Sequence, residues 1–175
     1  MNAPARTCGT CNLCCKVMYI EELEKPQGMW CPHASPGQGC TIHGSHPTSC
    51  QTFMCQWLLQ PALPEGLKPS RSKVVLSTVA GPRGEQLVAY CDPSDPTAWR
   101  RGDVYRLLKA QTMSPSGQPR MVIVRVDARW WLVTAGADHD LGEVDGRKAF
   151  RIEAGPDGKP VARQVEGAPG RKSPR

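Results

Sequence analysis

The sequence predicts an α+β protein in which an irregular, cysteine-rich N-terminal region precedes a small, mostly antiparallel sheet with one helix. Three observations predict it. Eight of the nine cysteines fall within the first 55 residues, Gly and Pro number 17 each, and short apolar runs separated by turn signals begin near residue 73. Frequent Gly and Pro favour short elements and many turns. The predicted parts are a cysteine-cluster region at 1–60, a β-rich region at 61–165 and a disordered basic tail at 166–175.

In the cysteine-rich region the pattern predicts one short helix, over residues 47–59. Pro47 suits its first turn, because the missing N–H would have no helical partner there. Phe53 and Trp57 are four residues apart and would share one face, so we expect them to pack together in the core. The stretch QPALPEG at 60–66 predicts a linker to the second region.

Three hairpins are predicted in the second region, each from two apolar runs that flank a turn signal. The paired runs are 74–76 with 86–90, 121–124 with 130–133, and 148–153 with 159–165. Trp130 and Trp131 are neighbours in one run, so they would point to opposite faces and only one could be exposed.

One helix is predicted between the first and second hairpins. Asp95 suits the N-cap and Pro96 the first helical position. Val104, Leu107 and Leu108 would form its apolar face, which predicts a two-layer arrangement of helix against sheet.

The crowding of cysteines has three possible explanations. A disulfide framework is typical of small secreted domains, but residues 1–7 carry no apolar signal segment. Inert buried thiols explain Cys91, which lies in an apolar run, but not cysteines that lie beside Gly, Pro, Thr and Asn. Metal ligation is the best explanation for the remaining eight, which are Cys8, Cys11, Cys14, Cys15, Cys31, Cys40, Cys50 and Cys55.

The spacing of the first four cysteines supports metal ligation. A C-x2-C step lets two sulfurs reach one ion while backbone N–H groups of the turn point at the thiolates. The step occurs twice in succession between Cys8 and Cys14, and Cys15 follows directly. Neighbouring side chains do not readily point the same way, so Cys14 and Cys15 either serve different ions or include a spare or redox thiol.

Histidines provide further candidate ligands, since a neutral imidazole binds metal. His33, His43 and His46 lie among the later cysteines, and for each of them the ordinary interpretation is a polar loop residue. His43, three residues after Cys40, is the best candidate of the three.

The whole pattern resembles the YkgJ-type cysteine-cluster family, which is named for a CxxCxxCC motif and described as zinc- or iron-chelating. The matching stretches are CGTCNLCC at 8–15, WCPH at 30–33, GCTIH at 39–43 and HPTSCQTFMCQWL at 46–58. Asn12 stands where the family often has Gly, and His46 where it commonly has Arg. The resemblance implies metal binding and no particular reaction.

The identity of the metal is left open by the spacing. Thiolates suit both zinc and iron–sulfur clusters. The start of the pattern resembles a ferredoxin motif, yet Cys15 and Cys31 are misplaced for a 4Fe-4S cluster of that type. Zinc sites more often use two separated C-x2-C pairs, which this chain does not have. We expect zinc or iron as a structural metal. Eight thiolates holding two divalent ions would lower the formal charge from +6 to about +2, which argues against a nucleic-acid partner.

The expected function is therefore that of a cytoplasmic metal-binding protein, with an iron–sulfur redox enzyme or a metal carrier or store as alternatives. No apolar stretch is long enough to span a membrane. There is no phosphate-binding Gly-rich motif, G-x-S-x-G or H-E-x-x-H, so no catalytic residue is named. Asp138, His139 and Asp140 are expected in a polar loop between strands. A protein partner is conceivable but not identified by any motif.

Overall fold

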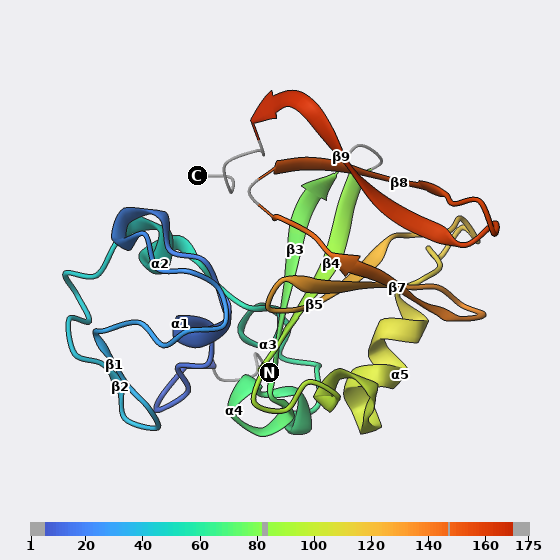
Figure 1. The fold of residues 1–175 in the computed structure, drawn as a ribbon. Coiled ribbons are helices and arrows are strands. Elements are labelled where there is room, and N and C mark those ends of the chain that lie inside the picture. The colour runs from blue at the N-terminus through green and yellow to red at the C-terminus, as the bar shows by residue number, and fades with distance from the viewer. Residues whose placement is uncertain (1–5, 82–83, 147, 170–175) are drawn as a thin grey trace.

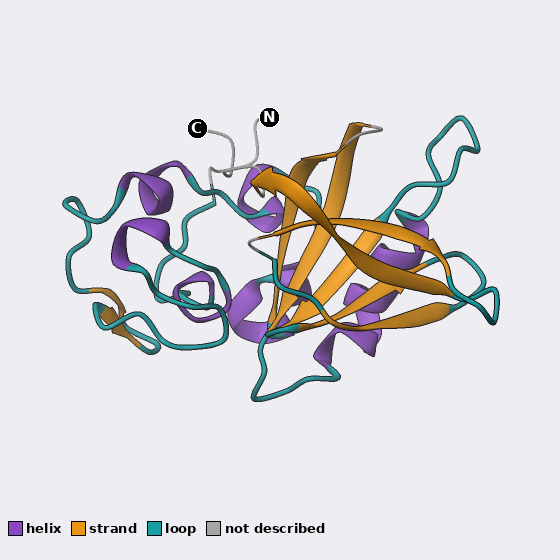
Figure 2. Cartoon of the chain, turned by 45° about the horizontal axis from the view of Figure 1, so that its top comes forward, coloured by secondary structure: helices purple, strands orange, loops and turns teal. Residues whose placement is uncertain are grey.

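A computed structural model of the chain describes residues 6–81, 84–146 and 148–169. It contains both helices and strands, which confirms the α+β class at that level. Figure 1 shows the cysteine-rich region as short helices and loops beside the strands of the β-rich region. Figure 2 shows how strongly the strands concentrate in the second part.

The cysteine-rich region contains only short elements joined by loops. Its longest helix has five residues. The elements are α1 (Cys14–Val17), η1 (Glu21–Leu23), β1 (Ala34–Ser35), β2 (Gly39–Cys40), α2 (Thr48–Thr52) and α3 (Gln56–Leu59).

The single helix predicted over residues 47–59 is wrong, because the chain is extended at Phe53 and Cys55 and separates α2 from α3. Phe53 and Trp57 consequently do not share a helix face. Helices this short depend on packing rather than on intrinsic propensity. Trp57 is 5% exposed and belongs to the core, so its insertion there determines where α3 runs.

The linker predicted at 60–66 leads into two further short elements, η2 (Glu65–Leu67) and α4 (Pro69–Ser72). Leu67 is buried against the core. The Arg6 guanidinium donates hydrogen bonds to the carbonyl oxygens of Trp57 at 2.8 Å and Pro61 at 3.0 Å, and so fastens the start of the chain to this segment.

Five strands form one mixed sheet in the order β3-β4-β5-β6-β7. They are β3 (Val74–Gly81), β4 (Gly84–Cys91), β5 (Val122–Val126), β6 (Arg129–Val133) and β7 (Asp138–Glu143). The β4–β5 pair is parallel and the other three pairs are antiparallel. A parallel pair needs a long crossover connection, and η3 (Ala98–Arg100) with α5 (Gly102–Ala110) lies in it.

The three predicted hairpins are confirmed. Gly81 pairs with Gly84 at the first turn, whose Pro82 and Arg83 lie outside the described residues. The second hairpin joins β5 to β6, and the third joins β8 (Lys148–Ala154) to β9 (Pro160–Pro169). β9 continues through residues 166–169 of the predicted tail, and residues 170–175 lie outside the described part of the chain.

The predicted helix start at Asp95–Pro96 is wrong, since α5 begins at Gly102. The Asp95 carboxylate pairs with Arg101 instead of capping a helix. Gly102 has φ +51°, a left-handed conformation that interrupts any continuous helix from Pro96. Trp99, which is 1% exposed, lies within the 3-10 turn η3, and its burial fixes this turn ahead of α5. The predicted apolar face is confirmed, with Val104 and Leu108 buried.

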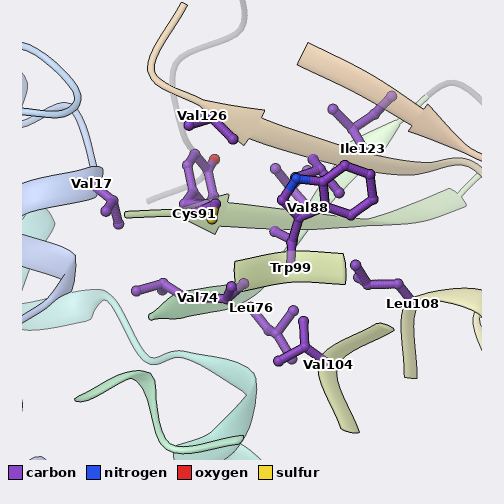
Figure 3. Close-up of a cluster of buried hydrophobic side chains, with 14 of the residues drawn as sticks. Val17, Val74, Leu76, Val88, Cys91, Trp99, Val104, Leu108, Ile123 and Val126 are labelled. Carbon is purple, nitrogen blue, oxygen red and sulfur yellow. The ribbon is translucent and has the colours of Figure 1, made fainter. Parts of the chain in front are cut away.

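One hydrophobic core joins the two regions. Leu13, Val17 and Trp57 of the cysteine-rich region belong to the same cluster as the buried residues of the sheet. Figure 3 shows Val17 beside the end of β4 that carries Cys91. Within the described residues, no helix has the length and apolar character that crossing a membrane requires.

Candidate metal centre

Each of the eight N-terminal cysteines lies in a short element or in the loop next to one. Cys14 and Cys15 open α1, Cys40 ends β2 and Cys50 lies within α2. Cys55 is the N-cap residue of α3. Cys8, Cys11 and Cys31 lie in loops.

A tight turn brings Cys8 and Cys11 together. The backbone N–H of Cys11 donates to the carbonyl oxygen of Cys8 at 2.9 Å, and Gly9 between them has φ +54°. Partial desolvation raises the pKa of the Cys8 thiol, and the nearby Cys55 and Cys11 thiols raise it further. The thiol of Cys55 also interacts with that of Cys11, so these three sulfurs form a first thiol group.

Cys55 sits at the point where α3 meets the core. It is 7% exposed, and this burial raises the pKa of its thiol. Hydrogen bonds from the backbone of Leu58 and Trp57 act in the opposite direction and favour the thiolate. This is the arrangement expected where a helix N-terminus receives a negatively charged sulfur.

The adjacent Cys14 and Cys15 thiols hydrogen-bond to each other. This contact raises the pKa of Cys14 well above its ordinary value and lowers that of Cys15 to about 7. Cys14 also interacts with Cys8 and Cys11 of the first group. Cys15 therefore gives up its proton before Cys14.

Cys15, Cys31 and Cys50 form a second thiol group. The thiol of Cys50 interacts with those of Cys15 and Cys31, and burial raises its pKa. The backbone supports this grouping, because the N–H of Cys31 donates to the carbonyl oxygen of Cys15 at 3.0 Å. Cys15 also interacts with Cys8 of the first group, so the two thiol groups meet at the neighbouring residues Cys14 and Cys15.

Lys25 lies against the second group and was not singled out by the sequence pattern. Its pKa is lowered because burial disfavours the charged form, while Cys31, Cys15, Cys14 and Cys50 act against that shift. No regular spacing marks this residue, because it comes from a separate loop that only the tertiary structure brings to the thiols.

Cys40 ends β2, and His43 and His46 follow it in the next loop. Cys40 pairs with Ala34 in the β1–β2 ladder, and Asn12 donates a side-chain hydrogen bond to the carbonyl oxygen of Ser35 in the same ladder at 2.8 Å. The rings of His43 and His46 stack with centroids 4.9 Å apart, and His46 Nδ1 accepts a hydrogen bond from the N–H of Gly44.

In the part of the chain that the structure describes, no three His, Cys, Asp or Glu side chains converge closely enough to hold a metal ion as they stand. Coordination by either thiol group therefore requires side-chain rotation and some closure of the loops.

The polar cluster at residues 138–140 has a different place from the one expected. These residues lie within β7 rather than in a loop. Asp138 forms an ion pair with Lys109 at 2.8 Å and accepts a hydrogen bond from the Tyr105 hydroxyl at 3.0 Å. Asp140 pairs with Arg129. Both carboxylates therefore serve the packing of α5 and the strands.

Cys91 lies in the sheet, apart from the eight N-terminal cysteines. It is 1% exposed at the end of β4, and burial raises the pKa of its thiol to about 11. Its Sγ contacts the carbonyl oxygen of Asp95 at 3.3 Å. The prediction of a buried, inert thiol agrees with this environment.

Comparisons with protein-family models, with curated proteins and with solved structures find no match. The interpretation of this site therefore depends on the residues themselves.

Proposed function

We propose that this protein chelates zinc or iron through its N-terminal cysteines and that the metal is mainly structural. The observation that carries the proposal is the gathering of thiols from separate segments. Cys8 and Cys55 come from opposite ends of the cysteine-rich region yet interact, as do Cys15 and Cys50. Soft thiolates at this density are the donor set that zinc and iron–sulfur clusters prefer.

The cysteine-rich region has little regular secondary structure to stabilise it, which supports a structural role for the metal. Its helices have at most five residues, and each of its two strands has two. Elements this short do not hold themselves together in water. Metal binding to thiolates would supply the missing free energy, as it does in small zinc domains.

The two thiol groups favour two ions rather than one. Cys14 would complete the first group with Cys8, Cys11 and Cys55, and Cys15 would serve the second with Cys31 and Cys50. A fourth ligand for the second group would come from Cys40, or from His43 if the site is mixed. This division agrees with the expectation that adjacent cysteines serve different ions.

Metal and acid-labile sulfide analysis of protein purified without oxygen tests the proposal directly. Stoichiometric zinc without sulfide would establish the structural zinc protein, whereas iron with sulfide would establish the iron–sulfur alternative. Protein that holds neither metal after growth and reconstitution would refute the proposal.

Exposure of Cys8 favours one alternative function, that of a metal carrier, because an exposed thiolate can exchange its ion. A carrier should yield its metal to a modest chelator while the far-ultraviolet circular dichroism stays unchanged. A structural site should retain the metal until the region unfolds.

The ligand assignment is tested with a matched pair of variants. Cys11→Ser should lose metal and unfold the cysteine-rich region, because it removes a donor common to the contacts of Cys8 and Cys55. Cys91→Ser should keep the full metal content, because Cys91 lies in the core of the sheet. A Cys11→Ser protein with unchanged metal content would contradict the assignment.

A further inference from the structure

Lys25 is a buried cation whose charge has no carboxylate partner among the described residues. It is 4% exposed, although lysine rarely lies fully buried unless paired. Its Nζ donates hydrogen bonds to the carbonyl oxygens of Lys16 at 3.0 Å and Met29 at 3.1 Å. An ammonium group has three N–H donors, so these two carbonyls leave one donor over.

The loop that carries Lys25 is built to hold it there. Lys25 and Ile20 exchange both backbone hydrogen bonds, at 3.0 and 3.1 Å, and Ile20 is itself buried. Glu24 between them takes a left-handed conformation with φ +47°, which is unfavourable for a residue with a side chain. The fold thus accepts local strain beside this lysine.

The same loop is fastened to the helix that carries Cys50. The Glu22 carboxylate accepts hydrogen bonds from the backbone N–H of Ser49 at 2.9 Å and from its hydroxyl at 2.6 Å. Lys25 and Cys50 are therefore held on one connected unit. Around Lys25 lie the thiols of four cysteines, Cys14, Cys15, Cys31 and Cys50.

Charge balance explains why a cation belongs at this place. A divalent ion bound by three or four thiolates has a net charge of −1 or −2, and burying such a charge is costly unless a cation compensates it. Lys16, whose backbone carbonyl Lys25 contacts, pairs its own ammonium group with the carboxylate of Asp92 at 2.7 Å. Lys25 has no such commitment.

We propose that Lys25 is the buried counter-cation of an anionic, thiolate-rich metal complex formed by Cys15, Cys31 and Cys50. The inference rests on the proposed function and makes it more specific, because it assigns net negative charge to the complex in the second thiol group. Lys25 acts as a positioning residue for that complex and is not itself a ligand.

The test measures zinc affinity by competition with a chromophoric chelator, on the full chain reconstituted with zinc alone. Lys25→Met keeps a similar length and removes the charge, and it should weaken the binding of one ion by about 10–100-fold, the usual effect of losing an outer-shell partner. Cys50→Ser should weaken the same ion, whereas Cys55→Ser should affect the other.

Two further variants separate charge from hydrogen bonding. Lys25→Arg keeps the cation and should retain most of the affinity, while Lys25→Gln keeps N–H donors without charge and should behave like Lys25→Met. Lys159→Met removes the same charge from an exposed position in the β8–β9 turn, and it should change nothing. These comparisons hold even if Lys25→Met lowers stability.

The outcomes distinguish this inference from the proposed function. Wild-type protein that binds no zinc would overturn both. Wild-type protein that binds zinc, with Lys25→Met or Lys25→Gln binding it equally tightly, would overturn only the role of Lys25.

Discussion

The two regions of this chain maintain their structure by different means. The β-rich region buries long stretches of its central strands, with Val74, Val122, Val124 and Val133 fully inaccessible. The described part of the cysteine-rich region buries far fewer apolar side chains, and two of these are Cys31 and Cys55. Apolar burial stabilises the first region, and under the proposed function metal–thiolate bonds and contacts with the β-rich region stabilise the second.

The two regions are not independent, because they share one hydrophobic core. α1 and α3 contribute Leu13, Val17 and Trp57 to the common core, as described above. The β-rich region therefore provides a surface on which the cysteine-rich region can assemble. If the proposed metal is bound, its removal should disorganise the cysteine loops while the sheet remains.

The largest expected effect comes from the core of the β-rich region. Trp99→Ala should lower the free energy of unfolding by about 3–5 kcal/mol, because a fully buried ring that contacts Trp131 is removed. Urea denaturation followed by far-ultraviolet circular dichroism measures this loss.

Trp30→Ala is the control within the cysteine-rich region, where the ring is 38% exposed. Its effect should be less than about 1 kcal/mol. Equal losses for the two variants would show that both regions depend on apolar burial alike.

A smaller effect is expected at the ion pair that joins the two regions, Lys16 with Asp92. Burial alone would raise the pKa of Asp92, but hydrogen bonds from Lys16 and Ser94 outweigh it, so the pKa is lowered. A lowered folded-state pKa gives stability that is present above the unfolded value of about 3.9 and is lost as the pH falls through the folded value.

Asp92→Asn should therefore cost about 2 kcal/mol at pH 7 and much less below pH ~3. Unfolding curves at several pH values measure both quantities. Asp157→Asn, in an exposed turn where solvent screens the pair with Lys159, should change the profile far less. A pH-independent cost for Asp92→Asn would mean that the charge of the pair is unimportant.

The last prediction concerns Cys91 and has the smallest effect on the fold. It is measured by the chemical reactivity of the thiol. With a pKa of about 11, roughly one Cys91 thiol in a thousand is ionised at pH 8, and burial hinders access as well. In native protein treated with a chelator, iodoacetamide should modify the thiols of the cysteine-rich region. It should modify Cys91 only after the protein is denatured. Mass spectrometry of peptides reads this out, and modification of Cys91 as fast as Cys8 would contradict it.

Sequence patterns predicted the β-rich region well where the signal was local. The turn signals at 81–84, 127–128 and 155–158 mark the three hairpins, because Gly and Asp accept the left-handed conformations found at Gly84 and Asp127. Two errors arose where tertiary contacts outweighed local preference. Trp99 and Trp57 are drawn into the core, and the chain around each breaks into short helical pieces.

The candidate cysteines are visible in the sequence, but their grouping is not. Cysteine spacing predicts them as metal donors, which stays a prediction. Nothing in the spacing indicated that Cys55 lies with Cys8, or that Lys25 lies among the thiols of Cys15, Cys31 and Cys50.

The sequence by itself thus determined the three hairpins and the crowding of cysteines on which the metal proposal rests, because both depend on the types and intervals of nearby residues. Only the tertiary structure decided the parallel β4–β5 pairing, the ion pair between Lys16 and Asp92, and the burial of Lys25. These features join segments far apart in the chain, and such contacts depend on which apolar surfaces pack together rather than on any local pattern.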